Sequence, residues 1–269
     1  MSKLADSNLL LGDQYRNASK LNARVLLHDR FSTNKYGWHR WAFDRMECPA
    51  ECRILELGCG TGLLWTKNRA RIPAGWDLTL SDFSPGMLRQ AREGIGGARS
   101  KLRFMRIDAQ AIPLDDGRFD AVVANQMLYH VPDLQRALGE IRRVLKAGGA
   151  LYAGTGGKAG GPGLGDWAAK AKAGGASGTR DLRAAQSFTL ENGGAALEPF
   201  FGRVRRELYE DGLEVTEVEP LVDYVQSTIS MRLEEDEVPV FRRLVAEEIE
   251  RRGAVRVAKS GGLFVARKG

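Results

Sequence analysis

The sequence predicts an α/β protein built on a doubly wound, mostly parallel β-sheet. Between residues 53 and 154, short apolar segments that are typical of buried strands alternate with segments of helical periodicity. Residues that start and stop helices separate them: Ser84-Pro85 suits a helix N-terminus, and Gly148-Gly149 suits a helix end. Because strands that alternate with helices pair in parallel, we expect helices on both faces of one sheet.

The core elements follow in order from residue 53. Residues 53–57 (Arg-Ile-Leu-Glu-Leu) are mainly apolar and run into glycines, which predicts a buried first strand. The same reasoning predicts further strands at 77–80, 102–107, 119–124 and 150–154, and helices at 62–71, 84–94 and 134–146.

The flanking regions are less regular. We expect helices at 15–30 and 37–46 before the core. Residues 155–179 are rich in glycine, and two interpretations stay open: a low-complexity linker, or a cap over a binding site. Strands are expected at 204–210 and 213–218, helices at 219–230 and 238–252, and a closing hairpin of 255–259 and 263–266 around Gly261-Gly262.

These elements suggest four segments. They are an N-terminal helical cap (1–48), a ligand-binding core (49–155), a glycine-rich insertion or cap (156–202), and C-terminal strands and helices that complete the sheet (203–269).

The composition is that of an ordinary globular protein. The net charge of +6 comes from basic residues interleaved with acidic ones, as in residues 247–252, which favours a mixed solvated surface over a nucleic-acid interface. No apolar run approaches the ~20 residues of a membrane-spanning helix, and the first residues do not resemble a signal peptide. We therefore expect a cytoplasmic protein, monomeric or homodimeric, without a membrane partner.

The three cysteines, Cys48, Cys52 and Cys59, do not suggest a disulfide framework, because they are few and odd in number. Their spacing is not a standard zinc pattern, so we expect no bound metal.

A glycine-rich turn, Gly58-Cys59-Gly60-Thr61-Gly62, follows the first strand and opens a helix. Glycines allow a tight turn and a close approach of the backbone to a ligand, and the helix N-terminus offers free N–H groups. The turn alone also fits a dehydrogenase or a simple loop.

Two carboxylates narrow the range of ligands that this turn could bind. Asp82 follows the second strand, where an acidic side chain can accept hydrogen bonds from ribose hydroxyls. Asp108 follows the third strand, where it can accept from an adenine amino group while the Ala109 N–H faces a ring nitrogen. Ligands of such sheets bind at the carboxyl ends of the strands, so these residues indicate one site.

The order of these motifs resembles that of class I S-adenosylmethionine-dependent methyltransferases, and the similarity is greatest to the small-molecule branch called type 11 or UbiE-like. That family implies a Rossmann-like seven-stranded sheet, S-adenosylmethionine as methyl donor with S-adenosylhomocysteine as product, and a small-molecule acceptor. Ala147 stands where the family usually has proline. The matching segments are 54–62, 80–88, 119–130 and 143–151.

The resemblance implies a role for each cofactor-binding residue. Glu56 and the backbone of the turn would hold the methionine amino end, to which the Asn125 carbonyl would also point. Arg30 and Lys35 are candidates for a cation that binds the cofactor carboxylate. The full expected cofactor-binding set is Glu56, Gly58, Cys59, Gly60, Asp82 for the ribose, Phe83 and Met87 beside the adenine, Asp108, Ala109 and Asn125.

On the acceptor side, His130 is the candidate general base, because it follows the fourth strand and titrates near neutral pH. A structural or substrate-packing role for this histidine stays open. Tyr129 is a second candidate, and Tyr36 and Trp38 are expected to cover or line the site. Trp41 and Phe43 are expected to dock their helix on the core instead.

Three alternative functions stay open. A nicotinamide dehydrogenase shares the turn and Asp82, but it does not explain Asp108 or residues 119–130. An RNA methyltransferase fits the positive charge, but residues 125–128 (Asn-Gln-Met-Leu) lack the Asn/Asp-Pro-Pro-aromatic motif of many enzymes that methylate amino groups of nucleic acids. A non-catalytic member of the fold is the third.

Overall fold

The computed structural model describes residues 19–96, 101–158, 160–161, 163–172, 187–228 and 230–269. The chain folds into two compact units. The first, here called the sheet unit, comprises Trp38–Gly156, Ser187–Tyr209 and Gly261–Gly269. The second unit comprises Met1–Gly37, Gly157–Gln186 and Glu210–Ser260. The expected segments 1–48 and 203–269 therefore each contribute to both units.

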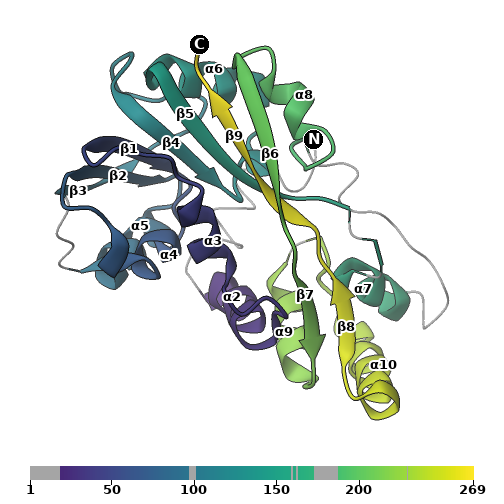
Figure 1. Ribbon diagram of the computed structural model, residues 1–269. Helices are drawn as coiled ribbons and strands as arrows, with labels where there is room; N and C mark the ends of the chain where they lie inside the picture. The colour runs from purple at the N-terminus through teal and green to yellow at the C-terminus, as the bar shows by residue number, and fades with distance from the viewer. Residues whose placement is uncertain (1–18, 97–100, 159, 162, 173–186, 229) are drawn as a thin grey trace. The chain divides into compact units, whose positions relative to one another are not determined.

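The sheet unit contains a seven-stranded sheet of order β3-β2-β1-β4-β5-β9-β6 (Figure 1). The first five strands in this order pair in parallel, and β9 pairs antiparallel with both β5 and β6. The predicted mostly parallel, Rossmann-like sheet is confirmed. The strands are β1 (Cys52–Leu57), β2 (Trp76–Asp82), β3 (Lys101–Arg106), β4 (Phe119–Asn125), β5 (Leu145–Gly156), β6 (Arg203–Tyr209) and β9 (Gly261–Arg267).

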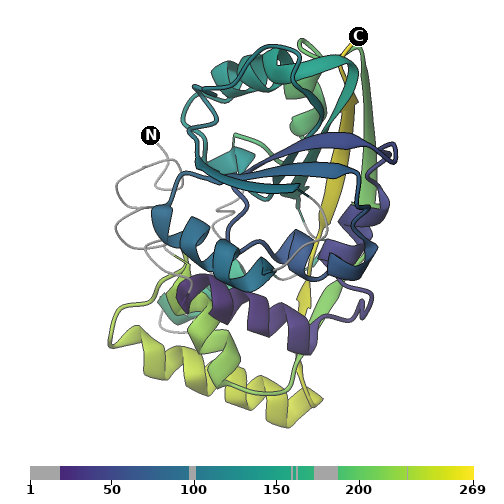
Figure 2. The same ribbon diagram turned by 90° about the vertical axis from the view of Figure 1, so that its left-hand side faces the viewer.

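Helices cover both faces of this sheet (Figures 1 and 2). Strand β4 shows why: Val122 and Ala124 enter one apolar core, and Ala121 and Val123 enter the other. Side chains alternate along a strand, so a fully apolar strand needs cover on both sides. One face carries α6 (Leu134–Val144) and α8 (Gly193–Leu197), and the other carries α3 (Trp38–Asp44), α4 (Leu63–Thr66) and α5 (Pro85–Ile95).

The second unit has a core of its own, to which Leu27, Leu213 and Phe241 contribute. Part of the glycine-rich stretch is helical there, as α7, whereas residues 173–186 lie outside the described residues. The elements are α2 (Ser19–Phe31), α7 (Leu164–Lys172), α9 (Glu219–Ser227), α10 (Glu237–Arg252), and the paired strands β7 (Gly212–Val215) and β8 (Val255–Ala258).

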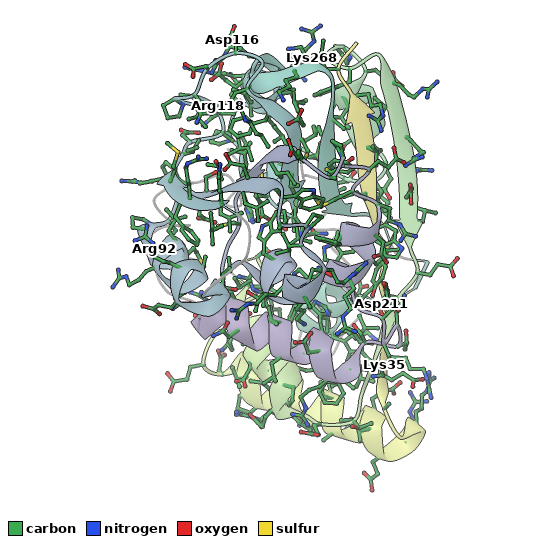
Figure 3. All side chains as sticks on the ribbon, turned by 60° about the vertical axis from the view of Figure 1, so that its left-hand side comes forward. Lys35, Arg92, Asp116, Arg118, Asp211 and Lys268 are labelled. Carbon is green, nitrogen blue, oxygen red and sulfur yellow. The ribbon has the colours of Figure 1, made fainter. Side chains whose placement is uncertain are left out.

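Among the described residues, no helix combines the length and apolarity that crossing a bilayer requires. Side chains of both signs lie on the surface of the sheet unit, as the labelled Arg92, Asp116 and Arg118 show (Figure 3).

The predicted hairpin around Gly261-Gly262 is wrong. Strand β8 pairs with β7, and β9 pairs with β5 and β6, so the two strands belong to different sheets. The glycines sit inside β9, where Gly262 has no room for a side chain: a Cβ there would overlap the carbonyl oxygen of Glu207. Close strand packing, and not a turn, explains this glycine.

The predicted helix 62–71 is also shorter than expected. It ends at Thr66, and a 3₁₀ turn follows at Arg69–Arg71. The buried Asn68 explains the break, because its Nδ2 donates to the carbonyl oxygens of Leu64 (2.7 Å) and His39 (3.0 Å). Such side-chain bonds compete with helical backbone bonds.

Candidate active site

The glycine-rich turn connects β1 to α4, and its three glycines all have positive φ: +67° at Gly58, +54° at Gly60 and +75° at Gly62. Side chains strain this conformation. At Gly58 a Cβ would also lie 2.8 Å from the Cβ of Met127, and at Gly62 one would lie 2.7 Å from Ile95 Cδ1. Bare backbone is therefore required, which leaves a surface of the kind that a cofactor can approach closely.

Strand register brings the expected polar residues to one edge of the sheet. Leu57 of β1 pairs with Ser81 of β2 and with Ala124 of β4. The residues that follow in each strand are Gly58, Asp82 and Asn125, so these three lie in register across neighbouring strands. Asp82 in turn pairs with Arg106 of β3, and Asp108 comes two residues later. Carboxyl ends of parallel strands are where such sheets bind ligands.

Asp82 ties the turn to the next helix. Its Oδ2 accepts a hydrogen bond from the Gly60 N–H (2.9 Å), and its Oδ1 accepts one from the Ser84 N–H (2.8 Å). Burial raises the pKa of this carboxyl, although the backbone donors oppose the shift. Two carboxylate oxygens can accept about four hydrogen bonds, so Asp82 retains capacity for a ligand hydroxyl.

Glu56 lies beneath the turn and is 2% exposed. Trp65 of α4 donates from Nε1 to Glu56 Oε2 at 2.6 Å. Burial, together with the nearby Asp82, raises the pKa of Glu56 to about 8, against the opposing effect of the Trp65 hydrogen bond. A buried carboxyl of this kind favours a cationic partner, because a positive charge would offset its desolvation.

Cys59 and Asp108 lie in the loops that follow β1 and β3 at the carboxyl edge of the sheet. Cys59 is buried, and its N–H donates to the Ser81 carbonyl oxygen (2.8 Å). Asp108 Oδ1 accepts hydrogen bonds from the backbone N–H (2.9 Å) and the side-chain Nε2 (3.1 Å) of Gln110. Ala109, which lies between Asp108 and Gln110 in the sequence, is buried. The Asp108 loop is thus held in a fixed conformation.

The two side chains that were expected beside an adenine differ in their surroundings. Phe83 is exposed, with the Arg106 guanidinium 5.3 Å from its ring centroid and Arg106 Nε donating to its carbonyl oxygen (3.1 Å). Met87, in the first turn of α5, is 1% exposed. Phe83 therefore presents a ring to solvent, while Met87 is enclosed by protein.

Asn125 ends β4 and has a partner that the sequence did not indicate. Its Oδ1 accepts a hydrogen bond from Trp38 Nε1 at 2.9 Å. The next residue, Gln126, has φ +58°, a conformation that no other non-glycine residue among those described adopts. Strained backbone of this sort is concentrated at functional sites. No local sequence signal identifies either feature, because both depend on contacts distant in the chain.

Tyr129 and His130 follow in a short 3₁₀ turn, Leu128–His130, that the fully buried Leu128 anchors. Their rings lie 4.5 Å apart. Both side chains are half-buried, which keeps them within reach of solvent or a ligand.

The N-terminal candidates divide between the units. Trp38 belongs to the sheet unit, whereas Tyr36 belongs to the second unit. Arg30 and Lys35 also belong to the second unit, where Arg30 pairs with Glu217 and Lys35 Nζ donates to the Arg30 carbonyl oxygen (3.3 Å). Trp41 and Phe43 are buried in the core of the sheet unit, as a docking role requires.

Comparison with known proteins shows what the core of the sheet unit resembles. Residues 55–153, which carry every expected cofactor-binding residue, match the family model described as "Methyltransferase domain". Residues 55–153 are thus similar to a methyltransferase domain, and the relatives described below include a UbiE protein. This similarity favours a methyltransferase over a nicotinamide dehydrogenase.

Two relatives and one solved structure illustrate this methyltransferase domain. The demethylmenaquinone methyltransferase of Thermus thermophilus is 40% identical over 114 residues, which are 42% of this chain and 51% of that protein. The ubiquinone/menaquinone biosynthesis C-methyltransferase UbiE of Idiomarina loihiensis is 31% identical over 116 residues, 42% of this chain and 46% of that protein. The chain thus spans about half the length of the curated relatives it matches.

The structure of a Haemonchus contortus phosphoethanolamine N-methyltransferase, solved with phosphomonomethylethanolamine and S-adenosylhomocysteine, superposes with a TM-score of 0.59. The superposition covers all of this chain and 60% of that one at 15% identity, so it shows a common fold.

Proposed function

We propose that this protein binds S-adenosylmethionine at the carboxyl edge of β1 to β4 and transfers its methyl group to a small-molecule acceptor. The observation that carries the proposal is the register that aligns Gly58, Asp82 and Asn125, with Asp108 following on β3. The bound cofactor would supply an electrophilic methyl group on a sulfonium. An acceptor atom would form a bond to the methyl carbon in line with the C–S bond, and S-adenosylhomocysteine would leave with the electron pair of that bond.

Different residues would contact different parts of the cofactor. The bare backbone of the glycine turn and the buried Glu56 would hold the methionine amino end, with the Asn125 carbonyl oxygen. Asp82 would accept from the ribose hydroxyls. Phe83 and Met87 would border the adenine, and Asp108 and Ala109 would recognise its edge. The full cofactor-binding set is Glu56, Gly58, Cys59, Gly60, Asp82, Phe83, Met87, Asp108, Ala109 and Asn125.

On the acceptor side we assign Tyr36, Trp38, Tyr129 and His130. His130 would take the proton of an acceptor hydroxyl or ring nitrogen, since imidazole titrates near neutral pH. The named activities of the quinone-methylating relatives support a small organic acceptor. We further propose a cytoplasmic protein that acts as a monomer or homodimer without nucleic acid.

Calorimetric titration tests the proposal. We expect the purified chain to bind S-adenosylmethionine and S-adenosylhomocysteine but not NAD. Asp82→Asn should weaken both interactions at least about tenfold, because a charged hydrogen-bond acceptor is lost from the ribose site. Asp115→Asn is the matched control, because the Asp115 side chain is 89% exposed. Binding of NAD alone, or equal affinities for wild type and Asp82→Asn, would contradict the proposal.

A further inference from the structure

Trp38, the first residue of α3, contributes a polar edge to the site. Its indole Nε1 donates a hydrogen bond to Asn125 Oδ1 at 2.9 Å, across 87 positions of sequence. The sequence suggested only an aromatic face at this position. The structure shows a specific contact between the helix that precedes the core and the residue that ends β4.

The indole is held firmly by its neighbours in the sheet unit. The ring centroid of Trp38 lies 5.3 Å from that of Trp41 and 5.4 Å from that of Tyr209, the latter edge-on. Such aromatic pairs fix ring orientation beyond simple burial. Trp38 is therefore a rigid donor and not a freely rotating side chain.

Gly154 of β5 leaves the room that this contact needs. A Cβ at residue 154 would lie 2.6 Å from Asn125 Oδ1 and 2.8 Å from Trp38 Cζ2. The carbonyl oxygen of Gly154 also accepts the N–H of Gln126 (2.9 Å), which supports the strained backbone there. Three elements, α3, β4 and β5, thus cooperate in placing one amide.

This contact determines how the Asn125 amide is oriented. Because Oδ1 accepts from Trp38 Nε1, Nδ2 is the part of the amide that can donate to a ligand, and the described residues show no partner for it. An amide nitrogen donates two hydrogen bonds and accepts none. The group it addresses must therefore carry lone pairs, as an oxygen atom does.

We propose that Trp38 is a positioning residue: it orients Asn125 so that the Nδ2 group donates to the carboxylate of the cofactor's methionine end. This inference rests on the proposed function and deepens it. The Asn125 backbone carbonyl is assigned to the adjacent ammonium of that same amino acid, so the side-chain donor lies at the right end of the ligand. The earlier cationic candidates, Arg30 and Lys35, engage other groups in the second unit.

Two ligands separate the carboxylate contact from the rest of the site. S-adenosylhomocysteine carries the amino-acid end, and 5′-methylthioadenosine lacks it. We expect Trp38→Phe, which keeps an aromatic ring but loses the N–H, to weaken S-adenosylhomocysteine binding about fivefold and to leave methylthioadenosine binding unchanged. Asn125→Ala should have at least the same effect, and the double variant should bind no more weakly than Asn125→Ala.

Trp76→Phe is the matched control for stability. Trp76 also donates from its indole, to the Pro49 carbonyl oxygen at 2.9 Å, but at the start of β2. We expect it to leave both affinities unchanged. Asn125→Asp gives a second test that leaves the indole packing intact, since it keeps an oxygen for Trp38 and removes the donor. It should weaken S-adenosylhomocysteine selectively.

The outcomes are distinct. If wild type binds neither ligand, the proposed function fails and this inference fails with it. If wild type binds, the inference alone is overturned by equal losses for the two ligands in Trp38→Phe, by unchanged S-adenosylhomocysteine affinity in either Trp38→Phe or Asn125→Asp, or by additive losses in the double variant.

Discussion

Gly58 adopts a backbone conformation that a side chain resists, and it faces a neighbour that leaves no space for one. Its φ is +67°, and an added Cβ would lie 2.8 Å from Met127 Cβ and 2.9 Å from Met127 Cγ. The first effect is local strain. The second displaces Met127, which lies two residues after Asn125 and so belongs to the segment that ends β4.

We therefore predict that Gly58→Ala weakens S-adenosylhomocysteine binding more than tenfold, measured by calorimetry. Gly148→Ala is its matched control, because Gly148 has φ +72° with nothing within 4 Å of an added Cβ. Both variants should lose about 1–2 kcal/mol of stability to the left-handed conformation, but only Gly58→Ala should lose affinity. Equal affinities for the two variants would refute a steric role for Met127.

For single residues, the sequence predicted the features that depend only on the order of neighbouring elements. Asp82 and Asp108 stand at predicted strand ends, and the parallel arrangement alone places them at one edge. The positive φ of Gln126 and the Trp38–Asn125 hydrogen bond were not predictable in this way. Both arise from packing among α3, β4 and β5, which no short stretch of sequence specifies.

At the scale of elements, β9 shows why a local pattern misled. Two β-prone segments separated by glycines suggest a hairpin, yet β9 runs between β5 and β6 and pairs with both. Gly262, the second residue of β9, packs against Glu207 and Leu190, with Leu190 Cδ2 3.0 Å from where a Cβ would lie. The same glycine permits a turn or a close strand contact, and only tertiary structure decides between them.

Gly262→Ala should accordingly destabilise the sheet unit by about 1–3 kcal/mol, since the obstacle is backbone that cannot rotate away. The neighbouring Gly261→Ala should have a much smaller effect, because its nearest surrounding atoms are 3.8 Å from an added Cβ. Urea denaturation followed by tryptophan fluorescence measures both. Comparable midpoints for the two variants would mean that β9 does not pack as closely as described.

At the scale of the whole molecule, each compact unit is assembled from segments far apart in the chain. The five parallel strands were predictable because each coincides with its own β-prone segment, and helical segments separate most of them. The division into units was not, since it follows from long-range pairings such as β7 with β8 and β5 with β9. Two of the three cores draw on both ends of the sequence.

Charged groups in both units make the stability of the protein depend on pH. In the second unit, the side chain of Asp211 (labelled in Figure 3) is 2% exposed, pairs with Lys259 and accepts hydrogen bonds from Ser32 Oγ (3.0 Å) and the Asn34 N–H (3.1 Å). Burial raises its pKa, but Lys259 and the donors outweigh this and hold the pKa below its ordinary value. The Arg143 guanidinium likewise lowers the pKa of Glu140 in the sheet unit.

The sign of their contribution follows from linkage. A carboxyl whose pKa is lower in the folded state stabilises fully above its unfolded pKa, near 4, and this stabilisation is lost as the pH falls through the folded pKa. Asp211 and Glu140 therefore make both units sensitive to acid. The contribution of Glu56 to stability depends on pH in the opposite sense, because burial raises its pKa from 4.5 to about 8.

Between pH 4.5 and about pH 8, the folded sheet unit holds a proton on Glu56 that the unfolded chain releases. We therefore predict that the free energy of unfolding of this unit falls as the pH rises from about 5 to about 8, by up to about 1.4 kcal/mol per pH unit. Glu56→Gln should flatten the slope, since its neutral amide keeps an oxygen for Trp65. Urea titrations across this range, followed by tryptophan fluorescence, measure the slope, because four of the five tryptophans belong to the sheet unit. Glu140→Gln is the matched control: it should lower stability without changing the slope above pH 5, and a wild-type slope retained by Glu56→Gln would show that another group carries the proton.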